Sequence, residues 1–421
     1  MTLFQKVIDY FKIFSDRKLL AFMGSGLIVS VAYMDPGNWG TDIAGGASFN
    51  YDLLWVVWLA SGMAMLFQYL SGKLGIAGYS LPELVREKLK KKWLVLSYWI
   101  LAEIAILATD LAEFLGIVVA LNLLFGIPLL FGTYIAVADV LIIILLTQKR
   151  FRTLEQAFII FVSIIGLGYV YELFITKPDV PSILLHSVKP ILTSQSALIA
   201  VGIIGATVMP HALFVHSWLI KNKIIGNHFG SKSKILKYHL IDNVVSLTIA
   251  GFINAAIIIM SAAAFYQVAN VATLDQAYTT LIPLFGKFAA IVFALALLSA
   301  GISSSVTGTL AGQSVMDGLT GFRISLWIRR LITRFINVIP VTIAVLLGIE
   351  PLKILVLSQV ALSLLIPLPL IPLIIYTSNK SIMKELVNKK ITTIFAIIFG
   401  IVILGFNGYL LYQVIFQGVG I

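Results

Sequence analysis

The chain has 421 residues, of which 59% are hydrophobic and only 12% are charged. Soluble domains carry about 25% charged residues, so this composition excludes a soluble globular protein and predicts a protein that lies in a lipid bilayer. The net charge of +11 is typical of basic cytoplasmic loops rather than of nucleic-acid binding, and we expect no nucleic acid as a partner. The lack of cysteine excludes disulfide bonds and thiolate metal sites.

Apolar stretches bounded by charged or turn residues predict an all-α membrane protein with eleven spanning helices, each near the ~20 residues that a bilayer needs. No loop is long enough for a core of its own, so residues 1–421 form one integral membrane domain. In chain order, the predicted spans are about 20–47, 52–72, 94–122, 128–147, 155–175, 193–221, 239–265, 280–312, 335–349, 352–376 and 391–416.

The distribution of basic residues predicts the orientation. The N-terminal stretch resembles a basic inner flank rather than a removable signal peptide. With the N-terminus in the cytoplasm, of the 30 basic residues only Lys177, Lys189, Lys287 and Lys353 fall outside. This assignment counts Arg323, Arg329, Arg330 and Arg334 as a cytoplasmic loop. We therefore expect a multi-pass plasma-membrane protein with an extracellular C-terminus.

Two of the predicted spans contain a proline beside polar residues. The first is interrupted at Asp35-Pro36-Gly37-Asn38 and the sixth at Met209-Pro210-His211. The two breaks are five spans apart, and an odd number of spans per half forces opposite orientations. Spans 1–5 (about 20–175) and 6–10 (about 193–376) are therefore predicted to be inverted repeats, followed by an extra helix. Paired breaks of this kind mark a transport site at the membrane midplane. The alternative is a pair of ordinary proline kinks, which are common in membrane helices.

The residues at the breaks are suited to a divalent metal ion. Asp35 offers a carboxylate, Asn38 an amide oxygen and Met209 a thioether. Proline has no N–H group, so Pro36 and Pro210 leave the carbonyls of Ala32 and Ala206 without their helical donors. Calcium and magnesium prefer shells made only of oxygen, whereas softer ions such as Mn²⁺ and Fe²⁺ accept sulfur. The sulfur is therefore expected to matter most for rejecting Ca²⁺, and we expect Mg²⁺ to be excluded as well.

The stretches "AYMDPGNW", "ATVMPH" and "AEIAILATDLAE" resemble the signatures of the Nramp family of proton-coupled divalent metal transporters, and the likeness covers nearly the whole chain. The resemblance implies a LeuT-type fold and import of Mn²⁺ or Fe²⁺, and of Cd²⁺ or Co²⁺, with protons by alternating access. It also implies that Gln359 joins Asp35, Asn38 and Met209 around the ion in a more closed state. We expect a monomer without a permanent cofactor.

Three positions depart from the family pattern. Ala212 stands where the family has asparagine, Leu365 stands where it commonly has glutamine, and Lys223 stands near an expected arginine. None of these removes a predicted metal ligand, so we expect them to affect gating, proton coupling or metal preference.

Charged residues inside the spans predict a proton route, because such residues are rare and mostly functional. Glu103, Asp110 and Glu113 lie within an arc of roughly 80° on the third span. They indicate either a proton relay or a buried polar seam that pairs with basic residues. His211, beside the sixth-span break, can titrate near neutral pH, and the resemblance supports it, Asp110 and Glu113 in this role.

The route is predicted to begin at Asp35, since metal binding and protonation compete at one carboxylate. Lys223 and Arg334 are expected near the cytoplasmic ends, where they would neutralise the acids. His216 is expected to face elsewhere, and Glu172 to lie at the membrane interface.

Other functions fit less well. A sodium-coupled amino-acid carrier would bind a substrate carboxylate at the first break, which Asp35 would repel. A metal channel would need neither the matched breaks nor the acidic face of the third span. The sequence has no His-Glu-x-x-His motif and no phosphate-loop lysine, so we do not expect an enzyme.

Overall fold

The computed structural model describes residues 17–141, 151–225, 229–266 and 274–416, and every regular element in those ranges is a helix. Over these residues, eight helices are long and apolar enough to cross a membrane. They correspond to eight of the predicted spans. The remaining three are the first, which is interrupted, the fourth, which is described only to Leu141, and the ninth, which carries three arginines. The count of eleven stays a prediction.

The helices of the first half of the chain lie within residues 17–141 and 151–188. Its two longer predicted loops, 73–93 and 176–192, each contain a short helix. In chain order, the helices are α2 (Arg17–Phe22), α3 (Ser25–Ala32), α4 (Pro36–Phe49), α5 (Leu54–Ala77), α6 (Leu81–Leu89), α7 (Lys92–Phe125), α8 (Leu129–Ala136), α10 (Phe151–Thr176) and α11 (Val180–Val188).

The second half again begins with an interrupted helix. Its helices are α12 (Ala197–Thr207), α13 (Pro210–Ile224), α14 (Lys232–Phe265), α15 (Leu274–Phe285), α16 (Lys287–Thr320), α17 (Leu326–Leu346), α18 (Pro351–Leu365), α19 (Pro367–Ser378), α20 (Lys380–Met383) and α21 (Lys390–Phe416), with a 3₁₀ turn at Lys384–Leu386.

Two predicted span boundaries are wrong. The predicted span 280–312 joins the end of α15 to α16, whereas the structure separates them at Gly286, whose φ of 89° suits glycine. The predicted span 335–349 omits the first part of α17, because its arginines were counted as a cytoplasmic loop. Arg329, Arg330 and Arg334 are instead buried in that helix.

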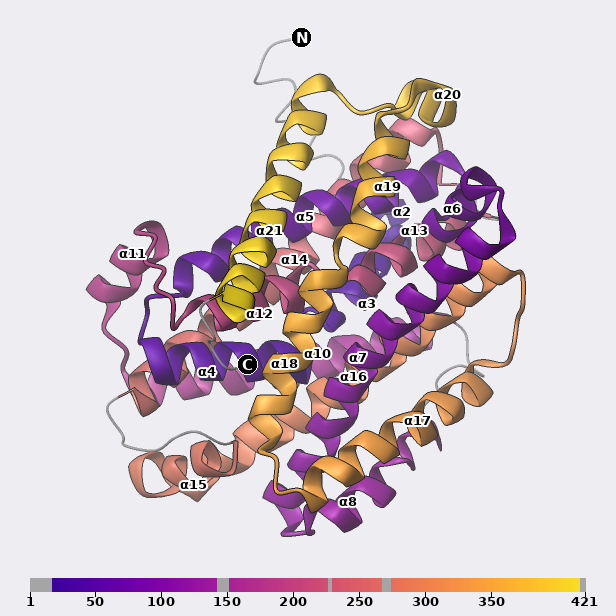
Figure 1. Ribbon diagram of the computed structural model, residues 1–421. Helices are drawn as coiled ribbons and strands as arrows, with labels where there is room; N and C mark the ends of the chain where they lie inside the picture. The colour runs from indigo at the N-terminus through magenta and orange to yellow at the C-terminus, as the bar shows by residue number, and fades with distance from the viewer. Residues whose placement is uncertain (1–16, 142–150, 226–228, 267–273, 417–421) are drawn as a thin grey trace.

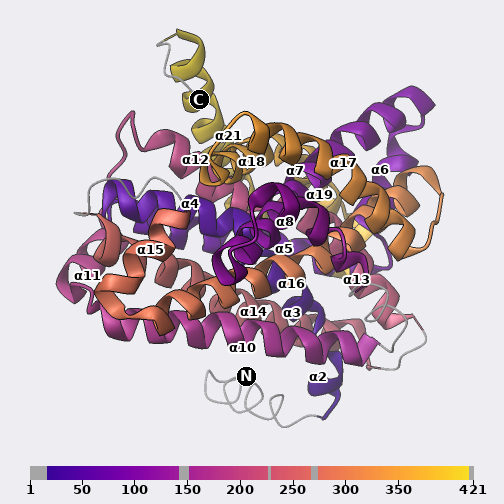
Figure 2. The ribbon, with the colours of Figure 1, turned by 90° about the horizontal axis from the view of Figure 1, so that it is seen from below.

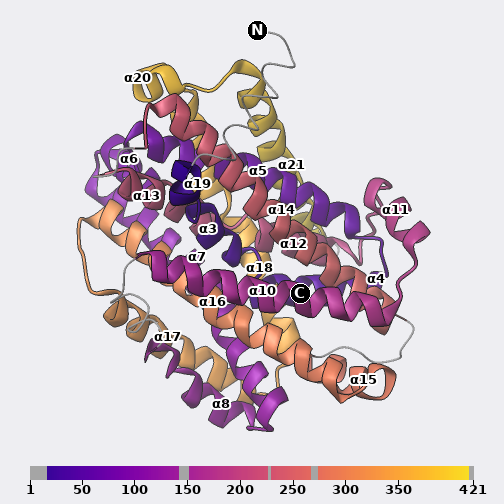
Figure 3. The same cartoon turned by 180° about the vertical axis from the view of Figure 1, so that it is seen from behind.

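The interrupted helices lie at the centre of the bundle. The most apolar stretch of α12 and α13 is 89% buried, against 28% for α10 and for α21. Figure 1 shows α21 at one edge, beside α19 and α12, and α17 beside α8 at another. Figures 2 and 3 show α10 on the opposite face, where it packs on α14 and α16. The central position places both breaks away from the lipid-facing surface.

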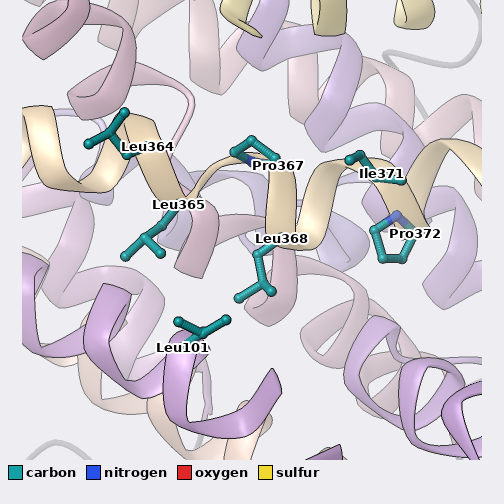
Figure 4. A pocket seen from close by; sticks show the side chains of 7 residues that line it. All are labelled: Leu101, Leu364, Leu365, Pro367, Leu368, Ile371 and Pro372. Atoms are coloured by element: carbon teal, nitrogen blue, oxygen red, sulfur yellow. The ribbon is translucent and has the colours of Figure 1, made fainter. Parts of the chain in front are cut away.

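A third interruption, which the sequence analysis missed, separates α18 from α19 at Ile366. Pro367 and Pro372 cannot donate to the carbonyls of Ser363 and Leu368. Asn407 of α21 donates to Ser363 O at 2.8 Å, and the Tyr98 hydroxyl donates to Leu368 O at 2.7 Å. An apolar pocket lies beside this break, and Leu365 is among its lining residues (Figure 4).

Candidate metal site and the adjoining ion-pair seam

The first break lies between α3 and α4. α3 ends at Ala32, and Asp35 caps α4 by accepting a hydrogen bond from Asn38 N at 2.7 Å. Pro36 takes the first helical position, where its missing N–H is tolerated. Gly37 and Asn38 therefore lie in the first turn of α4, so the interruption spans residues 33–35, slightly earlier than the sequence indicated. Asn254 of α14 donates to Tyr33 O at 2.9 Å and thereby satisfies a carbonyl within the break.

The N-terminal end of α3 is held by the same helix. Asp242 of α14 accepts hydrogen bonds from Gly24 N at 3.2 Å and from Gly26 N at 2.7 Å. A carboxylate at this position satisfies N–H groups that an α-helix leaves free and interacts favourably with the helix dipole. α14 thus contacts the beginning of α3 through Asp242 and the break that follows α3 through Asn254.

The second break lies between α12 and α13. α12 ends at Thr207, Met209 precedes the first turn of α13, and Pro210 occupies its first position. Met209 and Ala206 are fully buried. Because Pro210 has no N–H, it cannot donate to Ala206 O in the way that a continuous helix would require.

The Asn38 side chain connects the two breaks. With its amide oriented so that both ends find partners, its nitrogen lies 2.7 Å from Asp35 Oδ1 and 3.0 Å from Ala206 O, and its oxygen accepts from Asn254 Nδ2 at 2.9 Å. Three predicted metal-binding residues, Asp35, Asn38 and Ala206, therefore meet at one point. Asp35 Oδ2 is buried and has no hydrogen-bond partner.

Gln359 of α18 packs between the same two breaks. A Cβ atom at Gly37 would collide with the Gln359 side-chain amide, and a Cβ atom at Gly205 would collide with the Gln359 carbonyl. Glycine is therefore required on both α4 and α12 for α18 to approach. The Gln359 amide lies directly against Gly37, and its oxygen is buried without a hydrogen-bond partner.

Uncharged donors dominate this site. Across the described ranges, no three His, Cys, Asp or Glu side chains are grouped so that they could hold a metal ion. A metal site at the breaks must therefore combine the single carboxylate of Asp35 with amide, carbonyl or thioether atoms, a donor set that suits a softer divalent ion.

A seam of ion pairs runs between α7, α8 and α17. Arg329 donates to Glu103 at 2.6 Å, and Arg330 pairs with Asp110. Arg334 lies 3.4 Å from Asp110 Oδ1 and also donates to its backbone oxygen at 3.2 Å. The acids of the third span thus pair with basic residues, which agrees with the interpretation of these acids as a buried polar seam.

Asp139, which follows α8, completes the seam and was missed by the sequence analysis. It accepts hydrogen bonds from Arg330 at 2.7 Å and from Arg334 at 2.5 Å. Asp139 lies inside the predicted span 128–147, and this position could have identified it as a candidate, because charged residues within spans are mostly functional. Glu113 lies 3.7 Å from Arg330, and both of its carboxylate oxygens lack a hydrogen-bond partner.

His211 lies beside the second break and is fully buried. Its Nδ1 is 3.1 Å from the Thr109 hydroxyl, one residue before Asp110, and its Nε2 has no partner.

His216 instead bonds to Gln68 at 2.8 Å and faces elsewhere, as expected. Lys223 donates to Met23 O at 3.1 Å and lies over the Phe22 ring, whereas Arg334 lies within the seam.

Further residues that the sequence singled out are buried. Glu172 of α10, whose expected place at the membrane interface stays a prediction, is only 1% exposed. Asp242 and Asn254 had no assigned role, and both hold the interrupted first helix. Ala212 is buried in α13, one position after His211.

Comparisons with known proteins identify relatives of this chain. The chain is 47% identical over 398 residues to the "divalent metal cation transporter MntH" of Verminephrobacter eiseniae, which covers 94% of this chain and 90% of that protein. The structure resembles the crystal structure of the Eremococcus coleocola manganese transporter, with a TM-score of 0.81 and 31% identity over 92% of this chain and 85% of that chain.

A more distant likeness shows the fold alone. Mhp1, a nucleobase–cation symporter in a closed conformation, matches with a TM-score of 0.53 and 15% identity over 93% of this chain and 88% of that chain. The family model described as natural resistance-associated macrophage protein-like matches residues 26–413. This match confirms the resemblance inferred from the sequence motifs, and the chain belongs to the Nramp family.

Proposed function

We propose that this chain is a secondary transporter that imports divalent transition-metal ions together with protons. Its relatives are named as divalent metal cation or manganese transporters, and none of those names describes an enzyme. The observation that carries the proposal is the meeting of Asp35, Asn38 and the Ala206 carbonyl at the two breaks. The Asn38 amide nitrogen lies between Asp35 and the Ala206 carbonyl; when the metal replaces it and the amide turns its oxygen inward, Asp35, Asn38 and Ala206 O, with Ala32 O and the Met209 sulfur, would form the metal shell.

The proposed ions are Mn²⁺ and Fe²⁺, and also Cd²⁺ and Co²⁺. Only one ligand, Asp35, carries a charge, and Met209 supplies a soft donor. Ca²⁺ needs six to eight oxygen ligands, and Mg²⁺ requires near-octahedral geometry and gives up its water reluctantly. A shell with one carboxylate and one thioether offers too few oxygen donors for Ca²⁺ and does not compensate Mg²⁺ for the water it would lose, so we expect both ions to be rejected. Gln359 would complete the shell when α18 closes on α4.

The seam is the proposed proton route. It holds four acids (Glu103, Asp110, Glu113 and Asp139) and three arginines (Arg329, Arg330 and Arg334), so the acids outnumber the arginines by one. A single proton on the seam balances its charge. Asp35 would release its proton when the metal binds. The free Nε2 of His211 would accept it, and Nδ1, which faces Thr109 beside Asp110, would release a proton toward the seam.

Alternating access would follow from two inverted repeats that rock about the breaks at the membrane midplane. Residues 20–175 and 193–376 would form the repeats, with α21 as the extra helix. The proposed setting is the plasma membrane, with a cytoplasmic N-terminus, an extracellular C-terminus and a monomer as the working unit. Lys223, on Met23 O, would hold the inner part of the first helix until the gate opens.

Calorimetry in detergent tests the proposal, with Mn²⁺, Mg²⁺ and Ca²⁺ titrated in parallel. One Mn²⁺ site with no measurable heat from Mg²⁺ or Ca²⁺ is expected. Repeating the Mn²⁺ titration in buffers of different ionisation enthalpy should show that protons leave when the metal binds. Absence of Mn²⁺ binding would refute the metal site, equal binding of all three ions would refute the selectivity, and binding without proton release would refute the coupling at Asp35.

A further inference from the structure

The connection between α6 and α7 carries a run of basic side chains that belongs neither to the metal site nor to the seam. Residues 86–92 hold five basic residues and one acid, Glu87. The basic residues are Arg86, Lys88, Lys90, Lys91 and Lys92. All five are exposed, and in the described ranges none of them forms an ion pair with an acid. The run therefore presents positive charge that the protein itself does not compensate.

Other basic side chains on the same predicted cytoplasmic side are bound within the protein. Lys73 is only 3% exposed and donates to Asn388. Lys221 pairs with Glu83 at 2.5 Å. Lys223, as described above, donates to a backbone oxygen at 3.1 Å. In contrast to these lysines, the basic run is available to a partner outside the chain.

The packing of α6 fixes the direction in which part of this charge points. Leu81 and Val85 are buried against the protein, and Leu81 N donates to Ser217 Oγ of α13 at 2.9 Å. Arg86 and Lys88 lie on the exposed face of the same helix. An amphipathic helix held in this way keeps its charged face turned away from the protein.

An exposed apolar stripe begins on α7 where the basic run ends. Trp93 is 63% exposed, and Leu96, Ile100 and Ile104 follow it as exposed side chains on one face of the helix. In a membrane protein such a stripe contacts acyl chains, and a tryptophan at its end lies at the boundary between the bilayer and water. The basic run is therefore at the depth of the lipid headgroups.

The connection between α16 and α17 adjoins the same surface (Figure 1). A Cβ atom at Gly321 would lie 3.3 Å from Arg86 Nη1, which places this connection directly beside α6. Phe322, the next residue, is strongly exposed. The surface thus combines five basic side chains with exposed aromatic side chains from two segments that are far apart in sequence.

We propose that the α6–α7 connection binds the headgroups of anionic lipids in the leaflet on the predicted cytoplasmic side. A cluster of about four to eight Lys or Arg residues next to the cytoplasmic end of a membrane helix suits such lipids. The basic run supplies the complementary charge, and Trp93 with its apolar stripe keeps that charge beside the headgroups. A soluble anionic partner would need the charge alone. The proposal does not depend on which ion the protein transports.

Quenching of Trp93 fluorescence by brominated lipids tests this surface in proteoliposomes. Because the chain has seven tryptophans, the Trp93 signal is the difference between the protein and its Trp93→Phe variant. Mixtures of brominated phosphatidylcholine with unbrominated phosphatidylglycerol give the relative affinity of the two lipids beside Trp93. Phosphatidylglycerol should bind about tenfold more tightly, because each nearby Lys or Arg contributes roughly a fivefold preference and these contributions are not fully additive.

A charge-neutralised variant and a matched control locate the effect. The test variant carries Lys88→Gln, Lys90→Gln, Lys91→Gln and Lys92→Gln. It leaves only Arg86 and Glu87, whose charges cancel, so the two lipid affinities should come within about twofold of each other. The control variant carries Lys380→Gln, Lys384→Gln, Lys389→Gln and Lys390→Gln. These four lysines are also exposed, near α20 at the same end of the molecule (Figure 1), and their loss should leave the tenfold preference at Trp93 unchanged.

The salt dependence of the unaltered protein needs no lysine replacement. The preference for phosphatidylglycerol should shrink as ionic strength rises, because salt screens exposed charges. Equal affinities of the two lipids beside Trp93, or a preference that salt does not change, would overturn the proposal. An equal loss of preference in the test and control variants would assign the effect to the net charge of the whole inner face, and would also overturn the proposal.

Discussion

The two breaks and the seam are both buried and both contain carboxylates, but these carboxylates have different partners. At the breaks, Asp35 is the single charged group, and one of its oxygens has no partner. In the seam, Arg330 and Arg334 neutralise Asp110 and Asp139 through hydrogen-bonded pairs. A carboxylate already bound to a guanidinium group cannot bind a metal ion without leaving that partner, whereas Asp35 can.

This difference separates two tasks that both need buried acids. The breaks offer a negative charge surrounded by neutral oxygen and sulfur donors, which suits a cation that enters and leaves. The seam balances its charges internally, apart from one excess acid, which suits a proton that moves in small steps. Each of the following variants is chosen to abolish or to sharpen this contrast.

The largest effect is expected from Asp35→Ala. Loss of the single charged ligand should abolish Mn²⁺ uptake into proteoliposomes, because no other carboxylate at the breaks can replace it. Glu103→Gln, which removes an acid of the seam instead, should leave Mn²⁺ binding measurable by calorimetry. Near-normal uptake by Asp35→Ala would refute the proposed site.

Arg330→Met should destabilise the seam. Removing one partner of a buried ion pair leaves uncompensated charge and typically costs about 3–5 kcal/mol. The melting temperature in detergent should therefore fall clearly. Arg323→Met serves as the control, since Arg323 makes an exposed pair with Asp317 at 2.7 Å and such pairs contribute about 1 kcal/mol or less. Similar melting temperatures for the two variants would contradict the buried pairing.

Met209→Ala should change the selectivity of the breaks while leaving transport largely intact. Without the sulfur the shell is made of oxygen alone, and a water molecule takes its place, so Ca²⁺ should become a substrate. Competition of Ca²⁺ against Mn²⁺ uptake measures this change. Continued rejection of Ca²⁺ would show that the sulfur does not act as the filter.

His211→Gln should affect the connection between the two regions. The variant keeps a polar side chain near Thr109 but cannot carry a proton, so metal-driven acidification of the proteoliposome lumen should slow while Mn²⁺ binding remains. A pH-sensitive dye inside the liposomes reports the acidification. A wild-type rate would place His211 outside the proton route.

The smallest effect is expected at Glu83 of α6, outside the spans. Burial raises the pKa of this carboxyl, but hydrogen bonds from Lys221 and from Ser80 outweigh it and leave the pKa below its ordinary value of 4.5. A carboxyl group whose pKa is lower in the folded state than in the unfolded state stabilises the fold at pH values above its unfolded-state pKa. This stabilisation is lost as the pH falls through the folded-state pKa. The melting-temperature advantage over Glu83→Gln should thus be small at pH 7 and should shrink as the pH falls below the ordinary pKa of 4.5. A constant difference across that range would contradict the pairing.

The sequence predicted the elements that depend on local chemistry. Pro36 and Pro210 placed both central breaks, and Asp35 and Asn38 beside the first break meet the predicted Ala206 carbonyl of the second. The third break was missed because Pro367 lies among apolar residues, and the groups that satisfy its freed carbonyls, Asn407 and Tyr98, are far away in sequence.

The seam could be predicted only in part for a similar reason. The spacing of Glu103, Asp110 and Glu113 revealed their common face on α7. Their partners were assigned to a cytoplasmic loop, because a run of arginines ordinarily marks the inner side of a membrane protein. Burial of a guanidinium group depends on which helix packs against it, and sequence alone does not give that packing.

The most direct test of the central claim is anomalous diffraction at the manganese edge from crystals grown with stoichiometric Mn²⁺. One peak should appear within bonding distance of a carboxylate oxygen of Asp35 and of the sulfur of Met209. A peak held by oxygen atoms alone, or one located among the acids of the seam, would contradict the assignment of metal binding to the two interrupted helices.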